Sequence, residues 1–365
     1  MDPVKLIFCK EWSLILSYGS LLVVLLASEQ LFGNLETGAR VGLMFAWLFV
    51  VILFSAFSVV HHAESLAQKL GEPYGTLILT ISVIGLEAIM IATVMLTHDE
   101  NPKMARDTMY GVLMIVLNGL FGLSVLIGAW KRRFQSFNVQ SSDTYVGCLI
   151  VLVGVGLFLP AFVPGQSIFM FEIYLIIICT MLYGIFLWVQ THEHRGFFEY
   201  TLPGGEEVED GHPESPFGIR YHVALLIITL VPIVILAKQL SIVMDAALVN
   251  LGAPDALAGL VVAILILAPE GLAAVNAARH NNLQRALNIC LGSALATIGL
   301  TIPIVLIIGM VSGQQLILGL ESEEMVLVGL TGLLLMVNLG RGQTNFFKGV
   351  LHLVLFGSYV VFVFT

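Results

Sequence analysis

The chain has 365 residues, of which 58% are hydrophobic and only 11% are charged, and its formal net charge is −9. Soluble globular domains carry about 25% charged residues, and the mean hydropathy here is +0.95. This composition excludes a soluble fold, and no basic run is long enough to bind nucleic acid. We therefore predict an all-α integral membrane protein.

Apolar stretches of about 20 residues predict helices that cross a membrane, and we identify eleven of them. The first lacks a small-residue cleavage site, so we expect it to be a span and not a removed signal peptide. In chain order the predicted spans cover residues 12–32, 40–60, 74–97, 108–130, 144–163, 168–190, 221–244, 256–278, 284–312, 323–338 and 346–365.

The spans predict four parts of the chain. An N-terminal helix (1–39) precedes a first group of five spans (40–190), an acidic linker (191–220) and a second group of five (221–365). The linker also bears three histidines. Its simplest interpretation is a solvated connector, and the functional alternative is a cytoplasmic sensor of Ca²⁺ or pH.

The loops predict an orientation, because Lys and Arg accumulate on the cytoplasmic side of a membrane. A cytoplasmic N-terminus places most of these residues inside and puts the C-terminus outside. The inner set is Lys5, Lys10, Lys69, Lys131, Arg132, Arg133, Arg195, Arg220, Arg279, Arg285, Arg341 and Lys348, and the outer set is Arg40, Lys103 and Arg106.

An internal repeat leads into the third and eighth spans. Residues 64–75 read ESLAQKLGEPYG and residues 245–256 read DAALVNLGAPDA, so an acid, a Leu-Gly pair and a proline fall in register. A span with one central glutamate follows each segment, Glu87 in the first and Glu270 in the second. The alternative is coincidence, because Leu-Gly-x-Pro is a common signal that ends one helix and starts the next.

The two copies of the repeat would then be spans 2–6 and spans 7–11. The correspondence between them continues into the helix that follows each glutamate-bearing span. Arg106 precedes Asn118 by the same number of residues as Arg285 precedes Thr297. Because five is odd, the two halves have opposite orientations in the membrane. Inverted repeats of this kind are typical of secondary transporters, whose binding site lies at the midplane between the halves.

The two glutamates are the candidate functional residues. A carboxylate at mid-bilayer costs about 2.5–3.5 kcal/mol on insertion scales, so such residues are usually functional. A neutral glutamate hydrogen-bonded to another helix is the structural alternative. Burial and mutual repulsion favour protonation of an empty site, whereas a bound cation favours ionisation. One site that holds either protons or a cation would therefore exchange them.

Two facing carboxylates suit a hard divalent cation such as Ca²⁺, which takes six to eight oxygen ligands. Pro269 would expose one backbone carbonyl, and Gly85 permits a similar kink. Nearby hydroxyl and amide oxygens are candidate neutral ligands, although such groups commonly bond their own helix backbone instead. They are Thr80, Ser82, Asn118, Ser293 and Thr297.

Several short runs resemble one known family. They are FSVVHHA (57–63) with LGEPYG (70–75), LAPEGL (267–272), RALN (285–288) and ALATI (294–298). Over nearly its whole length the chain resembles the bacterial calcium/proton and sodium–potassium/proton antiporters of the cation/calcium exchanger superfamily.

The resemblance implies eleven spans in a bacterial inner membrane, two inverted repeats, and Glu87 and Glu270 as the residues that carry cation and proton. The wider superfamily often has Gly-Asn shortly before each glutamate, but Val83-Ile84 and Ile266-Leu267 stand here. Gly271 also replaces a histidine found in many relatives. The amide ligands are absent, so both Ca²⁺ and Na⁺ or K⁺ are candidate cargoes.

Polar residues at the equivalent mouths of the two repeats are candidate entrance or proton-path residues, and the histidines among them end the second span on the cytoplasmic side. The simpler interpretation is that the histidines lie at the membrane interface and that the acids cap helices. The candidates are His61, His62, Glu64, Glu72 and Asp245.

We expect a secondary antiporter that exports Ca²⁺ against inward protons. The alternatives are a Na⁺ or K⁺/proton antiporter for alkaline pH and salt homeostasis, and a passive cation channel. No His-Glu-x-x-His motif, serine elbow or metal-ligand spacing favours an enzyme. We expect no cofactor, and partners limited to the lipid bilayer and the transported ions; a homo-oligomer is an open alternative.

Overall fold

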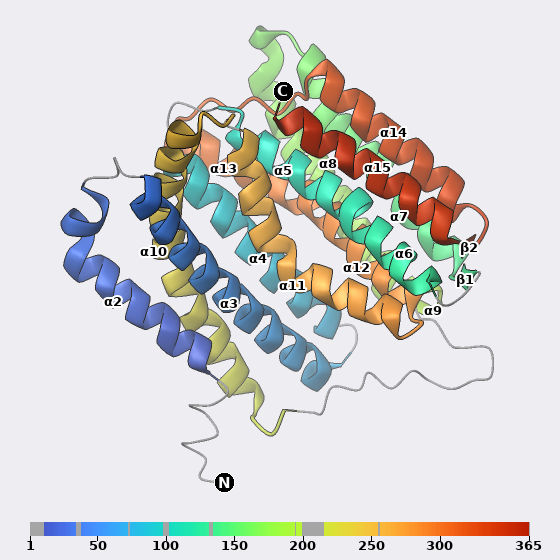
Figure 1. The fold of residues 1–365 in the computed structure, drawn as a ribbon. Coiled ribbons are helices and arrows are strands. Elements are labelled where there is room, and N and C mark those ends of the chain that lie inside the picture. The colour runs from blue at the N-terminus through green and yellow to red at the C-terminus, as the bar shows by residue number, and fades with distance from the viewer. Residues whose placement is uncertain are drawn as a thin grey trace. The chain divides into compact units, whose positions relative to one another are not determined.

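The computed structural model describes residues 11–33, 38–71, 74–97, 102–130, 134–193, 195–198, 215–254 and 256–364. These residues form long helices and one two-stranded ribbon (Figure 1). The first half contains α2 (Trp12–Phe32), α3 (Gly38–Leu70), α4 (Tyr74–Thr97), α5 (Met104–Met114), α6 (Phe121–Ala129), β1 (Gln135–Ser136), α7 (Val139–Val153), α8 (Ile168–Trp188) and α9 (Arg195–Phe198). The second half contains α10 (Ile219–Leu251), α11 (Ala256–Arg279), α12 (Leu283–Ala296), α13 (Ile302–Ser312), α14 (Ser322–Leu339), β2 (Gln343–Thr344) and α15 (Phe346–Val363).

Short π-helical and 3₁₀ segments join several of these helices into longer rods. The π-helices are η1 (Ile115–Leu120), η2 (Gly154–Phe158), η5 (Val189–Glu193) and η6 (Thr297–Thr301), and the 3₁₀ turns are η3 (Leu159–Phe162) and η4 (Gly165–Ser167). With these joints, each of the eleven predicted stretches corresponds to one rod. Within the described residues, nine rods are long and apolar enough to span a bilayer, and α2 and α4 contribute shorter apolar stretches. The prediction of an all-α membrane protein is confirmed.

Two helices are much longer than the sequence predicted. The expected spans 40–60 and 221–244 lie within α3 and α10, which have 33 residues each. Hydropathy detects only the apolar part of a helix, whereas both helices continue through polar turns. Each ends at a glycine with left-handed backbone, Gly71 (φ +65°) and Gly252 (φ +61°), a conformation that only glycine adopts without strain.

The helices divide into two compact units. Unit 1 contains α2, α3, α4, α10 and α11 as far as Ala268, and unit 2 contains α5 to α9, α11 from Pro269, and α12 to α15. Each unit thus draws helices from both halves of the sequence.

In unit 1, α3 packs along α10, and α2 and α4 pack against both. Pro232 lies inside α10 and cannot donate to the carbonyl of Ile228, four residues earlier. The Tyr18 hydroxyl of α2 donates to that carbonyl at 3.0 Å. A second bond joins Trp47 of α3 to Ser20 of α2, at 3.2 Å from Nε1 to Oγ. These bonds supply polar partners where water is absent.

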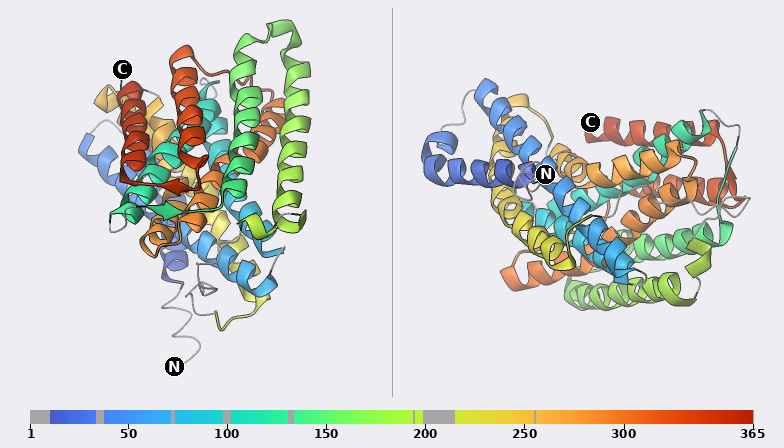
Figure 2. Two further views of the ribbon diagram at one scale, coloured as in Figure 1. Left: turned by 90° about the vertical axis from the view of Figure 1, so that its right-hand side faces the viewer. Right: turned by 90° about the horizontal axis from the view of Figure 1, so that it is seen from below.

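In unit 2, α6 packs along α15, α8 along α13, and α7 against α12 and α14. The contact between α6 and α15 is close, since a Cβ on Gly349 would lie 2.8 Å from the carbonyl oxygen of Gly122. Small residues at such crossings let membrane helices approach. The antiparallel pair β1–β2, with Gln135 opposite Thr344, lies at one end of this unit (Figure 2).

Contacts between connecting segments agree with the predicted alternation of the spans. In unit 2, Lys103 Nζ lies 2.7 Å from Glu321 Oε1, and β1 pairs with β2. In unit 1, Lys69 donates to the carbonyl of Ser215 at 2.8 Å. Each contact joins segments that the distribution of Lys and Arg places on the same side of the membrane. Which side is cytoplasmic stays a prediction.

Candidate functional site

Glu87 lies near the middle of α4 in unit 1, and its side chain is only 3% exposed. Thr80 precedes it by two helical turns, so the two side chains project from the same face about 10 Å apart along the axis. Ser82 projects about 140° away around the same helix. Both are half-buried. The geometry of α4 therefore favours Thr80 over Ser82 as a partner of the Glu87 face.

Glu270 lies on the part of α11 that belongs to unit 2, and it is half-buried. The Ser293 hydroxyl of α12 donates to Glu270 Oε2 at 2.6 Å. Pro269, just before the glutamate, leaves the carbonyl of Leu265 without its usual helical donor. Glu270 thus occurs at a weakened point of its helix, with one hydroxyl held against its carboxyl group.

Asn118 lies in the π-helix η1 and is fully buried, where its amide joins three rods of unit 2. Its Nδ2 donates to Thr331 Oγ1 of α14 at 2.8 Å, and its Oδ1 lies 3.1 Å from His352 Nδ1 of α15. These bonds use one of the two N–H donors of Nδ2 and one acceptor position of Oδ1. The role of Asn118 as a neutral ligand stays a prediction, but its side chain already has a structural one.

Thr297 begins the π-helix η6, one turn after Ser293. Its hydroxyl donates to the Ser293 carbonyl oxygen at 3.0 Å, the bond to its own helix that was the structural alternative. The two π-helices η1 and η6 contain Asn118 and Thr297, the positions that the sequence repeat aligned. π-helical segments frequently mark functional sites, so the repeat includes this local widening of the helix.

Glu87 and Glu270 lie in different units. The expectation that the two carboxylates face each other therefore stays a prediction. Among the described residues, no group of three or more His, Cys, Asp or Glu side chains is arranged to hold a resident metal ion.

The candidate entrance residues have different surroundings. His61 is exposed, Glu64 and Asp245 are half-buried, and Glu72 lies outside the described residues. His62 is buried at 1% exposure and contacts His222 and Glu11. Sequence reasoning missed these two partners, because Glu11 and His222 precede or begin spans far apart in the chain. The linker residues 194 and 199–214, with most of its acids, lie outside the described residues.

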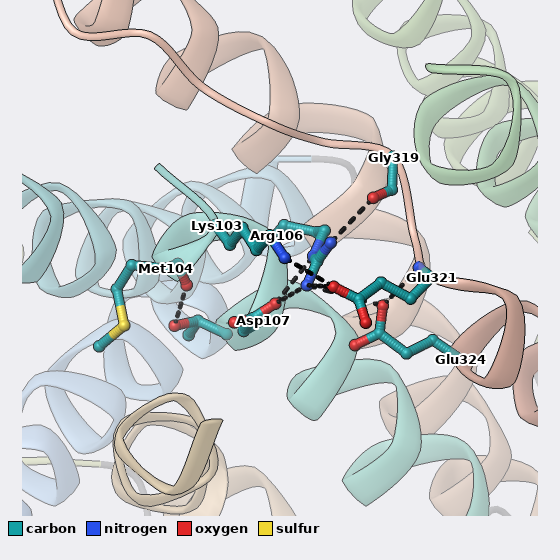
Figure 3. Close-up of polar contacts among 8 residues, drawn as sticks. Lys103, Met104, Arg106, Asp107, Gly319, Glu321 and Glu324 are labelled. Atoms are coloured by element: carbon teal, nitrogen blue, oxygen red, sulfur yellow. Dashed lines mark hydrogen bonds and ion pairs between the residues drawn. The ribbon is translucent and has the colours of Figure 1, made fainter. Parts of the chain in front are cut away.

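A second polar cluster that sequence reasoning missed surrounds Arg106 at the start of α5 (Figure 3). Arg106 is 3% exposed; its Nη2 lies 2.6 Å from Asp107 and 3.7 Å from both Glu321 and Glu324. Its Nη1 donates to the Gly319 carbonyl at 3.0 Å. The hydrogen bond from Lys103 holds the pKa of the Glu321 carboxyl below its usual range.

The Arg106 cluster links α5 to the start of α14. Glu321 and Glu324 form a capping box there, in which the Glu321 amide donates to Glu324 Oε2 at 2.8 Å. A buried arginine in contact with three carboxylates holds the start of α5 against the start of α14. A charge count of loops cannot distinguish it from a solvated residue.

Paired long and short helices, each short helix with a glutamate near its middle, are typical of a secondary transporter of the inverted-repeat class. The family model for the sodium/calcium exchanger protein matches residues 40–192 and 221–365. The chain belongs to this family, and it is a multi-pass membrane antiporter of cations.

The similar proteins span the whole chain. The sodium-potassium/proton antiporter ChaA of Escherichia coli (strain K12) is 37% identical over 97% of this chain and 96% of its own length. A vacuolar calcium ion transporter of Schizosaccharomyces pombe (strain 972 / ATCC 24843) is 22% identical over 94% and 84%. The selenium-substituted Ca²⁺/H⁺ antiporter protein YfkE has a similar fold, with a TM-score of 0.75, 18% identity, and coverage of 96% and 99%.

Proposed function

We propose that this protein exchanges a monovalent cation, Na⁺ or K⁺, for protons across a bacterial inner membrane, with Glu87 and Glu270 as the shared carriers. The observation that carries the proposal is the repeat, in which each short helix has a carboxyl group near its middle, buried at Glu87 and half-buried at Glu270. A cation binds the ionised groups, protons neutralise them, and the two loads exclude each other.

The choice of a monovalent cation rests on ligands and on relatives. Ca²⁺ requires six to eight oxygens, yet apolar residues precede both glutamates and the Asn118 amide already bonds Thr331 and His352. The relative at 37% identity is named as a sodium-potassium/proton antiporter. Together these observations move the preferred cargo from Ca²⁺, the sequence-based expectation, to Na⁺ or K⁺.

Ca²⁺ is the second candidate, because two carboxylates can neutralise a divalent charge and the similar YfkE fold is that of a Ca²⁺/H⁺ antiporter. Neither cargo calls for a resident cofactor. The cation is the substrate in both cases.

The test is transport by purified protein in proteoliposomes that carry an imposed proton gradient and a pH-sensitive dye. Na⁺, K⁺ and Ca²⁺ are added separately to wild type and to Glu172→Gln, a control that removes another carboxyl group from a predicted span. We expect Na⁺ or K⁺ to dissipate the gradient in both proteins. Dissipation by Ca²⁺ alone would replace the first candidate with the second, and cation flux that ignores the gradient would indicate a channel.

A further inference from the structure

Three buried polar residues gather in unit 1, at the start of α2, near the polar end of α3 and at the start of α10. His62 and His222 are each 1% exposed, and Glu11 is 7% exposed. None of them lies on α4 or α11, the helices that carry the transport glutamates. The exchange mechanism therefore leaves this cluster without a role.

Every ring nitrogen of the two histidines has a partner. His62 Nδ1 lies 3.0 Å from His222 Nδ1, and His62 Nε2 lies 3.3 Å from Glu11 Oε2. His222 Nε2 lies 2.9 Å from Ser215 Oγ, and the Tyr221 hydroxyl donates to Glu11 Oε1 at 2.8 Å. The cluster therefore connects α2, α3, α10 and the segment before α10 through one chain of hydrogen bonds.

The contact between the two Nδ1 atoms can hold only one proton. In the neutral arrangement, His222 donates from Nδ1, His62 accepts, and His62 donates from Nε2 to Glu11. One added proton makes His62 an imidazolium that donates to both neighbours, while His222 donates from Nε2 to Ser215. A second added proton places two N–H groups and two positive charges against each other, and the bond is lost.

We propose that the His62–His222 pair is a pH-sensitive clasp between α3 and α10, closed in the neutral and singly protonated states and opened by the second proton. The regulatory role of this clasp rests on the proposed function, the exchange of a cation for protons. Each cycle of cation export brings protons to the cytoplasm. A clasp on the face that carries the linker would slow transport once that compartment becomes acidic.

Among the described residues, the charged and titratable groups that face the pair are Glu11, Tyr221, His61 and Lys69. Burial raises the pKa of Glu11, but the hydrogen bonds with His62 and Tyr221 and the charges of His62 and His61 outweigh burial and hold it below its ordinary value. Glu11 is therefore ionised through the pH 5–8 range in which imidazoles change charge. The negative charge of Glu11 therefore compensates the positive charge that the first added proton gives to His62.

Within the part of the chain that the structure describes, the second proton has no such partner. The His61 ring lies tilted beside the His62 ring with a centroid distance of 5.6 Å, and Lys69 donates to the carbonyl of Ser215, whose hydroxyl contacts His222. These positive groups oppose a second charge on the pair. The stabilising bond is thus present at neutral and alkaline pH and is lost as pH falls.

The first experiment measures thermal unfolding of the purified protein from pH 8 to pH 4, which needs no transport. His222→Gln keeps hydrogen-bonding capacity but cannot become charged, and His280→Gln, an exposed histidine bonded to its own helix, is the matched control. We expect the Tm of wild type and His280→Gln to fall by several degrees more than that of His222→Gln. Parallel curves for all three proteins would overturn the clasp.

The second experiment varies pH on one side of the proteoliposome membrane at a time. On the linker side, wild type should lose at least fivefold in rate between pH 7 and pH 4, and His222→Gln less than twofold. Glu11→Gln should shift the acid limb to lower pH, because the first proton loses its counter-charge, and it replaces His222→Gln if that variant does not fold. Loss of this side dependence, or identical profiles, would overturn the proposal.

The failure of the proposed function has a different signature. Absence of cation-dependent proton flux at every pH would reject the antiporter but would leave the pH dependence of Tm in place to test the clasp.

Discussion

The two glutamate-bearing repeats have the same framework but different chemistry. In each, a 33-residue helix ends at a left-handed glycine and is followed by a 24-residue helix with a glutamate near its middle. Glu270 has a proline before it, a closely packed glycine after it and a serine hydroxyl on its carboxyl group. Glu87 is preceded by Gly85, where a Cβ would meet nothing within 4 Å.

The comparison separates what folding requires from what transport requires. The turns and helix lengths set the position of the glutamate, and both repeats keep them. In the proposed mechanism, the groups around each carboxylate set its affinity for a cation, and there the repeats differ. We therefore expect equivalent framework substitutions to have equal effects and equivalent substitutions around the glutamates to have unequal ones.

The largest effect should come from the glutamates themselves. In the proposed mechanism, Glu87→Gln and Glu270→Gln each remove a charge that a proton or cation must neutralise, so each should abolish coupled exchange. Proton-coupled cation uptake into proteoliposomes measures this, with Glu172→Gln as the control. Wild-type exchange in either glutamine variant would contradict the shared role of the two repeats.

The next effect should distinguish the two repeats. Ser293→Ala removes the hydroxyl that donates to Glu270, and hydrogen bonds to charged groups contribute about 1.5–3 kcal/mol. We expect the KM for the cation to rise about tenfold or more, at 1.4 kcal/mol per factor of ten. Ser82→Ala, on another face of α4 from Glu87, should change KM by less than about twofold. A reversed order would show that Ser82 is the more important oxygen.

The main framework of the molecule could be predicted from sequence. Apolar stretches located all eleven rods, because a bilayer imposes length and hydrophobicity on each helix locally. The Leu-Gly-x-Pro repeat located Gly71 and Gly252, whose left-handed backbone the structure then displays. Both signals are carried by neighbouring residues, so no knowledge of packing was needed.

The partners of polar residues could not be predicted in this way. Asn118 reaches Thr331 and His352, more than 200 positions later, and His62 reaches His222. Such pairs depend on which helices pack together, which hydropathy does not specify. The same limit explains why Arg106 read as a loop charge, although it is buried among carboxylates.

A smaller effect should arise from packing beside Glu270. A Cβ on Gly271 would lie 2.7 Å from Leu120 Cδ2, so Gly271→Ala requires Leu120 to move. Overpacking of this kind costs about 1–3 kcal/mol, whereas Gly85→Ala adds a methyl group where there is space. We expect a lower Tm for Gly271→Ala than for Gly85→Ala, and recovery in the double variant Gly271→Ala/Leu120→Ala. Equal Tm values would remove this difference between the repeats.

The smallest effects should also be the most alike. Gly71→Ala and Gly252→Ala each place a Cβ on left-handed backbone, which costs about 1 kcal/mol or slightly more, and neither Cβ would meet a neighbour within 4 Å. The cost is therefore one of backbone conformation alone, and Tm should fall equally in both variants. Asparagine, which tolerates this conformation better, should restore part of each loss. Unequal losses would mean that the two turns no longer perform the same task, and that the repeats have diverged in their framework as well as around their glutamates.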